Sequence, residues 1–341
     1  MKQSKLSTGI DIAADTFVVS IISEPGTALH GPQEFENNLE GYTELVAWFK
    51  QNNIKPKDMI ICMESTGVYG EKLCYFLYHK KYRLAVEQAK KVKRAFKIDG
   101  HKTDPADSLQ IAEYAFRYYD ELHPWKPREE IVEKIKAMIT SRELLVTHKT
   151  AMSNSLHALN RKAVRPSVAI RIMEKEKQAL ANAIKMLEKK MNKLTLIDPY
   201  VRQTVNNLKT LMGVQDLMAL NMLVITNGFK SEKYYKQIAS YLKIAPLRHE
   251  SGTSVYKKPK SPKYGPRIIR KLLHLAARTV VTHDPVYKIY YLRKQKEGKP
   301  KQLVLNNVGN KLIKMMCAMI RDQKPFIKHY HSVHPELLKT A

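Results

Sequence analysis

The sequence has few cysteines and no long apolar run. Its 341 residues include three cysteines, Cys62, Cys74 and Cys317, and no CxxC pair. Zinc sites and disulfide frameworks are therefore not expected, and a reducing compartment is favoured. No stretch reaches the ~18 consecutive apolar residues of a membrane helix, and the first 17 residues lack the apolar core of a signal peptide. We expect a cytoplasmic protein with no membrane partner.

Acidic residues are scarce over the last two thirds of the chain. Residues 1–120 hold 16 basic and 16 acidic residues, whereas residues 121–341 hold 43 basic and 16 acidic residues, which accounts for the whole formal net charge of +27. A neutral first part joined to a strongly basic remainder indicates a polyanionic partner, and nucleic acid is the first candidate. A basic surface that is only solvated is the simpler alternative.

Strand and helix patterns alternate over the first third of the chain. Two short apolar stretches, 7–13 and 15–26, predict a hairpin. After them the sequence predicts a strand at 58–66, a helix at 68–79, a strand at 82–88, a short helix at 89–97 and a helix through 107–119. This alternation is typical of an α/β domain, which we assign to residues 1–125.

The rest of the chain reads as helical. Residues 126–198 are almost free of glycine, and Pro166 divides them into two long helices, packed as an antiparallel hairpin or a coiled-coil connector. Residues 199–330 predict a mostly α-helical, basic domain in which 248–266 is a loop and 267–283 an amphipathic helix. Residues 331–341 are a tail. The spacing of His329, His331 and His334 would allow them to bind a divalent metal ion, but we expect this segment to be a solvated chain end.

Four carboxylates come from three elements of the first domain. Asp11 lies in the first strand, Glu64 ends a later strand, and Asp104 and Asp107 lie three apart at a helix start. Ligands of open α/β sheets gather beyond the carboxyl ends of strands, and positions i and i+3 share a helix face. Carboxylates suit Mg²⁺, and two such ions can clamp the oxygens of a phosphodiester. The pattern favours a ribonuclease-H-like metal site, although caps and surface acids would explain each residue singly.

A basic stretch follows the Ser-Gly pair at Ser251 and Gly252, and no acid lies between Ser251 and Lys271. Such a stretch can follow a phosphate backbone, with an affinity that falls steeply as salt rises. The predicted nucleic-acid-binding residues are Lys257, Lys258, Lys260, Lys263, Arg267, Arg270 and Lys271. Because Ser-Gly is also a common turn pair, the local sequence alone favours a turn at Ser251 over a nucleophile.

Several motifs together resemble one family. GIDIAADTF, MESTGVYG and KTDPADSLQIAEYA resemble the RuvC-like amino-terminal domain of the DEDD-type insertion-sequence transposases, the IS110 family. Residues 142–159 resemble the family's helical connector, and residues 208–277 resemble its carboxy-terminal transposase domain. The resemblance covers most of residues 7–280. The chain departs from the family pattern in one turn: where the family usually has Pro-Gly-x-Gly, this sequence has a single glycine, Gly213.

The resemblance implies a DNA recombinase of a bacterial or archaeal cell. The catalytic, metal-coordinating acids would be Asp11, Glu64, Asp104 and Asp107, with Mg²⁺ as the cofactor. Ser251 would attack DNA and form a phosphoserine link. From the local sequence, Ser254 is the fallback because it lies three residues on in the same stretch, and His249 is a candidate proton shuttle, although a lone histidine in a loop is more often a surface residue. A structured noncoding guide RNA would pair with target and donor DNA. Bringing two DNA sites together implies dimers and dimers of dimers.

Two other functions remain open at this point. A metal-dependent, RuvC-like nuclease specific for branched DNA would use the four acids alone, and Ser251 would be a turn residue. A non-catalytic nucleic-acid-binding protein would bind in a salt-dependent manner without a magnesium requirement. A DNA invertase is a close variant of the recombinase, because the sequence does not reveal how the two DNA sites are arranged.

Overall fold

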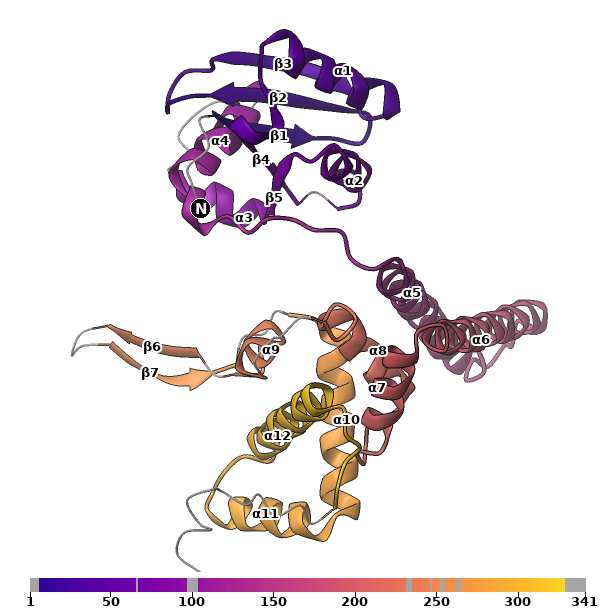
Figure 1. Cartoon of the computed structure of the whole chain (residues 1–341). Helices are drawn as coiled ribbons and strands as arrows, with labels where there is room; N and C mark the ends of the chain where they lie inside the picture. The colour runs from indigo at the N-terminus through magenta and orange to yellow at the C-terminus, as the bar shows by residue number, and fades with distance from the viewer. Residues whose placement is uncertain are drawn as a thin grey trace, which may run out of the picture. The chain divides into compact units, whose positions relative to one another are not determined.

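The computed structural model describes residues 6–65, 67–96, 104–230, 235–245, 247–251, 255–261 and 265–328, with only the backbone described at 104–105, 247–251 and 255–260. The chain divides into two compact units, Met1–Pro127 and Arg128–Ala341 (Figure 1). Within the described ranges, no helix is both long enough and apolar enough to span a bilayer.

The first unit is built on a mixed five-stranded sheet of order β3-β2-β1-β4-β5. The strands are β1 (Leu6–Ile12), β2 (Thr16–Ile22), β3 (His30–Glu36), β4 (Met59–Glu64) and β5 (Arg83–Glu87). β1, β2 and β3 pair antiparallel, whereas β4 and β5 run parallel to β1. The predicted hairpin and the two later strands are confirmed. β3 was not predicted, because this edge strand is largely exposed and lacks an apolar pattern.

Helices cover both faces of this sheet. On one face, α1 (Leu39–Gln51) and α2 (Glu71–His79) pack over inward side chains such as Ile10, Ile61 and Met63. On the other face, α3 (Ala89–Ala95) and α4 (Asp104–Arg117) pack over Ile60 and Cys62. Single 3₁₀ turns lie at Pro56–Asp58 and Tyr119–Glu121. The predicted α/β class is therefore correct, and α1 is a helix that sequence analysis did not predict.

The second unit opens with two long helices on either side of Pro166, α5 (Glu130–Leu159) and α6 (Ser167–Thr195), which pack side by side (Figure 1). Both helices were predicted, and whether they form a coiled coil stays a prediction. Shorter helices follow: α7 (Pro199–Lys209), α8 (Asp216–Ile225), α9 (Tyr235–Tyr241), α10 (Arg267–His283), α11 (Pro285–Lys296) and α12 (Lys301–Asp322). Their apolar faces form one core that also includes Ile135 and Ile139 of α5.

Residues 248–266 were predicted as a loop, and this prediction is wrong for most of the stretch. The strands β6 (Leu247–Ser251) and β7 (Val255–Lys260) pair antiparallel. The predicted tail from 331 onward and the three histidines near it lie outside the described residues.

The single glycine of the turn between α7 and α8 has a clear structural reason. Gly213 adopts a φ of +85°, and a Cβ there would meet the carbonyl oxygen of Ala276 in α10 at 2.9 Å. A left-handed backbone and close packing against α10 therefore both require glycine at this one position.

Candidate active site

Asp11 and Glu64 lie at the same edge of the sheet. β1 and β4 pair in parallel, and the last paired positions are Ile10 on β1 and Met63 on β4. Asp11 directly follows Ile10, and Glu64 directly follows Met63. Their Cα atoms therefore lie side by side at the carboxyl ends of β1 and β4. Both side chains are half-buried.

Both carboxylates also belong to the same face of the sheet. Ile10 and Met63 pack under α1 and α2. Since side chains alternate between the two faces along a strand, Asp11 and Glu64 point to the opposite face, which α3 and α4 cover. Cys62, two residues before Glu64, lies in the core on that face.

The first turn of α4 lies at this same edge. Ser108 packs against Gly9 of β1, and its hydroxyl is 2.8 Å from that of Ser20 on β2. Farther along α4, Glu113 accepts a 2.9 Å hydrogen bond from the N–H of Gly26, which follows the carboxyl end of β2. Because β2 runs antiparallel to β1, Gly26 lies beyond the amino end of β1. The helix therefore runs opposite to β1, and its amino end lies where Asp11 lies.

Two of the four predicted acids, Asp104 and Asp107, come from that first turn. Asp107 is half-buried in α4, and Asp104 is the first residue of the helix, with its side chain outside the described set. Among the side chains that the structure describes, no three Asp, Glu, His or Cys residues form a metal-ligand cluster. The elements thus bring the four positions to one edge, and the ligand set itself stays a prediction.

A further acid that the sequence analysis did not identify lies at the same edge. Glu87 ends β5 and is paired in register with Glu64 of β4. Its side chain is 11% exposed, and its carboxylate lies 3.4 Å from Lys91 Nζ. The neighbouring Tyr114 side chain and this ion pair raise the pKa of Lys91, so the ammonium stays protonated and balances Glu87. Burial, together with Glu87 and Glu64, raises the pKa of the Cys62 thiol.

The donor chemistry at this edge fits a hard divalent cation. Asp11, Glu64 and Asp107 supply only carboxylate oxygens, which Mg²⁺ and similar ions prefer. Cys62 and Cys74 of this unit are buried, and burial raises the pKa of Cys74 to about 12, so they do not supply soft thiolate ligands.

Gly9 allows α4 to approach β1, and we expect its replacement by alanine to be strongly destabilising. A Cβ at Gly9 would lie 2.1 Å from the carbonyl oxygen of Ser108 and 2.3 Å from the backbone nitrogen of Ala112. Because both atoms are backbone, the helix must move, and Gly9→Ala should lower the free energy of unfolding by about 3 kcal/mol. Gly70→Ala is the control, since its Cβ would meet nothing closer than 3.5 Å. Urea unfolding of both variants checks this; equal midpoints would contradict the packing.

The predicted nucleophile lies in the second unit. Ser251 is the last residue of β6, and its register partner is Val255, the first residue of β7. Residues 252–254, which include Ser254, lie outside the described set, as does Lys263. Lys257, Lys258 and Lys260 lie on β7, the side chains of which are not described.

The remaining predicted basic residues lie on the first turns of α10. Arg267 and Lys271 are exposed, and Arg270 is half-buried. His274 and Arg278 continue the same helix at three- and four-residue steps, so the basic side chains form a stripe along one face of α10. Such a stripe suits contacts with a phosphate backbone.

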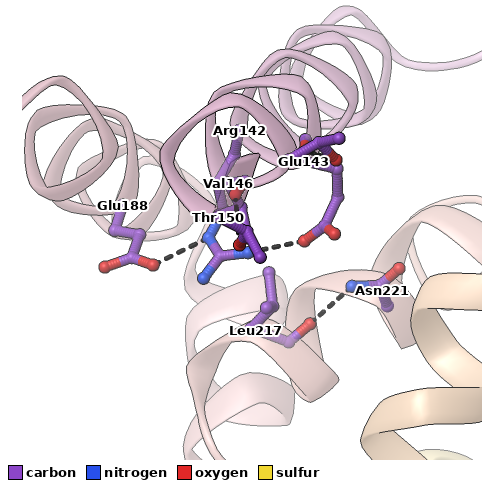
Figure 2. A network of polar contacts seen from close by, with 8 residues as sticks. Arg142, Glu143, Val146, Thr150, Glu188, Leu217 and Asn221 are labelled. Atoms are coloured by element: carbon purple, nitrogen blue, oxygen red, sulfur yellow. Dashed lines mark hydrogen bonds and ion pairs between the residues drawn. The ribbon is translucent and has the colours of Figure 1, made fainter. Parts of the chain in front are cut away.

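A polar network joins the long helices of the second unit (Figure 2). Arg142 of α5 donates a 2.7 Å hydrogen bond to Glu188 of α6 and a 2.5 Å hydrogen bond to Glu143. The network lies above α8, where Asn221 donates to the carbonyl oxygen of Leu217 at 2.7 Å. Arg142 has a side chain only 16% exposed, so the ion pair is more shielded from solvent than a surface pair.

We expect Arg142→Met to destabilise the second unit by about 1–2 kcal/mol, because it removes two charge-assisted hydrogen bonds and leaves Glu188 without this cation. Lys134→Met is the matched control, since Lys134 pairs with the exposed Glu130 on the outer surface of α5. That change should shift stability by less than about 0.5 kcal/mol. Thermal unfolding of both variants makes the comparison, and equal shifts would mean that the network contributes no more than a surface pair.

Models of known protein families match residues in both units. A DEDD transposase model of the IS110 type matches residues 8–164, and a model of the transposase IS116/IS110/IS902 family matches residues 205–292. The pilin gene-inverting protein of Moraxella lacunata is 25% identical over 337 residues, which is 96% of this chain and 99% of that protein. A 43.6 kDa protein of insertion element IS110 from Streptomyces coelicolor is 30% identical over 115 residues, 34% of this chain and 28% of its own length.

Among solved structures, Thermus thermophilus RuvC in complex with a Holliday junction is similar at 10% identity and a TM-score of 0.28, covering 35% of this chain and 99% of RuvC. The two family models together span most of the chain, in the order that the sequence motifs predicted. The chain belongs to the IS110 family of transposases, enzymes that cleave and rejoin DNA.

Proposed function

We propose that this transposase exchanges DNA strands through a phosphoserine intermediate at Ser251, with Mg²⁺ bound by Asp11, Glu64, Asp104 and Asp107. The observation that carries the proposal is the convergence of the ends of β1 and β4 with the amino end of α4 at one sheet edge. This edge belongs to one unit, and the β6–β7 hairpin that contains Ser251 belongs to the basic second unit.

The chemistry follows from the residue types. The hydroxyl oxygen of Ser251 attacks a backbone phosphorus, a serine O–P bond forms, and the O–P bond to one deoxyribose breaks, which releases that sugar's hydroxyl. Attack by a hydroxyl of another strand reverses these steps, so the bond energy is kept and no ATP is needed. Mg²⁺, when bound, would stabilise negative charge on the phosphoryl oxygens. Lysines of β7 and arginines of α10 would hold the flanking phosphates.

We further propose that a structured guide RNA selects the DNA sites and that the enzyme acts as a dimer and as a dimer of dimers. The basic excess after residue 120 is large enough for RNA and DNA together. Exposed apolar side chains on the two connector helices support an oligomer: Leu144, Val168, Ile172 and Met186.

DNA inversion is a second candidate for the overall reaction. Two relatives that match nearly the whole chain are pilin gene-inverting proteins, at 25% identity. Inversion and transposition would use the same strand chemistry and differ in how the two DNA sites are arranged.

A plasmid assay tests the proposal and separates these outcomes. Two copies of the DNA junction that flanks the gene would be placed in direct or inverted orientation, with the chain and the intergenic RNA supplied together. Recombined junctions found by sequencing, dependent on the RNA, would support the proposal. Inverted segments alone would favour the invertase. Nicked or linear plasmid without rejoined junctions would contradict strand exchange and favour a hydrolytic nuclease.

A further inference from the structure

A pocket of about 310 Å³ opens between α10 and α12 in the second unit. Its apolar part comes from Leu273 of α10, from Leu305 and Gly309 of α12, and from Ile244, which follows α9. Gly309 contributes no side chain, and apart from the backbone of α12 itself, the nearest described atom to a Cβ built there is the Cβ of Leu273, at 4.0 Å. The absence of a side chain at this position keeps the pocket open.

The polar part of the pocket is basic and rich in amides. Arg270, Lys271 and His274 of α10 line one side, and Gln302 and Asn306 of α12 line the other. Among the described residues that line it, none is an aspartate or a glutamate. Arginine and lysine favour phosphate, whereas glutamine and asparagine can both donate to and accept from the edge of a base.

The pocket lies where the β6–β7 hairpin joins the helices. The carbonyl oxygen of Ile244 accepts hydrogen bonds from Asn306 Nδ2 at 2.9 Å and from Ser261 Oγ at 3.1 Å. Ile244 precedes β6 by a few residues, and Ser261 directly follows β7. One wall of the pocket is thus tied to both ends of the hairpin that carries Ser251.

The size of the pocket limits what it can hold. Sites for small molecules run from about 300 to 1,000 Å³, so this pocket is at the lower end, and it is far too small for a duplex. An apolar floor, amide groups beside it and cations at one side match the three parts of a nucleotide: the face of the base, its edge and its phosphate.

We infer that this pocket holds one unstacked nucleotide of a single nucleic-acid strand, with the base over Leu273 and Leu305 and the phosphate next to Arg270 and Lys271. The inference rests on the proposed function, because it identifies a nucleic-acid strand as the ligand that the same domain binds beside the Ser251 hairpin. If one nucleotide is held at the base of the hairpin, the position of the whole nucleic-acid strand along the hairpin is fixed. The pocket therefore positions the strand and takes no part in bond cleavage.

Mononucleotide binding tests this inference on the full-length protein. The probes are AMP, dAMP, adenosine and inorganic phosphate, measured by ligand-observed NMR. We expect a nucleotide to bind more tightly than either adenosine or phosphate. A preference for AMP would identify an RNA strand, a preference for dAMP would identify a DNA strand, and equal binding would fit a pocket that reads base and phosphate only.

Two pairs of variants connect the binding to the pocket. Gly309→Leu fills the pocket and should weaken nucleotide binding about tenfold, whereas Thr279→Leu, at an exposed position of α10 outside the pocket, should leave it unchanged. Lys271→Gln should weaken binding several-fold, whereas Lys288→Gln, an exposed lysine of α11 outside the pocket, should not. The second pair decides the matter if Gly309→Leu does not fold.

Wild-type affinity in folded Gly309→Leu, or in Lys271→Gln if Gly309→Leu does not fold, would overturn the inference. Phosphate binding as tightly as the nucleotides would also overturn it, since the pocket would then be a simple anion site. Mononucleotide binding needs neither Ser251 nor DNA cleavage. Failure of this test and failure of the phosphoserine mechanism are therefore separate results.

Discussion

Ser251→Ala is expected to reduce strand exchange by at least about 10³-fold, because it removes the oxygen that would bond to phosphorus. The change deletes a single oxygen atom at the end of β6, and we expect the free energy of unfolding to change by less than about 0.5 kcal/mol. Recombined plasmid junctions, counted by quantitative PCR against total plasmid, give the size of the effect.

Ser254→Ala is the matched control, since Ser254 lies three residues further along the same hairpin sequence. We expect it to retain strand exchange within a few-fold of wild type. If Ser254→Ala lost activity and Ser251→Ala kept it, the nucleophile would be Ser254. If both variants kept cleavage and rejoining, a serine nucleophile would be ruled out.

Asp11→Asn and Glu64→Gln are each expected to reduce DNA cleavage by at least about 10²-fold. Both changes keep the side-chain shape and remove a negative charge from the edge where β1 and β4 end. A divalent cation would lose a carboxylate ligand, and an amide binds Mg²⁺ more weakly. Removing one of several neighbouring acids also lowers their mutual repulsion, so stability should be unchanged or slightly higher.

Glu44→Gln controls for a general loss of negative charge in the first unit. Glu44 is exposed on α1, which covers the opposite face of the sheet. Cleavage of labelled junction DNA across a magnesium titration measures all three variants. Wild-type cleavage by Asp11→Asn or Glu64→Gln, or magnesium-independent cleavage by the wild type, would contradict the proposed metal site.

The positions of the acids could be predicted from the sequence because each lies at the end of a strand or the start of a helix, and the sequence pattern shows where these elements end or begin. Asp11 and Glu64 come at the close of apolar strands, and Asp104 and Asp107 open a helix through a proline. Glu87 was missed although it also ends a strand. Its significance depends on pairing in register with Glu64, and register between β4 and β5 is a tertiary property that one strand does not show.

The β6–β7 hairpin was mistaken for a loop because its sequence carries turn residues and charge in place of an apolar alternation. Gly252, Pro259 and Pro262, with the nearby lysines, are typical of irregular chain. The backbone pairing of Ser251 with Val255 overrides these signals. Strand propensity depends strongly on context, and here the local pattern gave the wrong answer.

The pocket between α10 and α12 could not be predicted from the sequence either. Its residues come from three separate segments, near 244, at 270–274 and at 302–309. The sequence around each segment has an ordinary helical pattern. Gly309 within α12 would by itself predict only a slightly less stable helix. The pocket exists because the packing of the two helices leaves the space beside Gly309 unfilled.

The most direct test of the account is a search for a covalent link between protein and DNA. Purified protein, the candidate RNA and labelled junction DNA would be mixed with magnesium, denatured and separated by gel electrophoresis, and the linked peptide would be identified by mass spectrometry. We expect an adduct at Ser251 that is absent from Ser251→Ala and strongly reduced in Asp11→Asn. Cleaved DNA with no adduct, unchanged in Ser251→Ala and lost in Asp11→Asn, would contradict it and identify a hydrolytic nuclease.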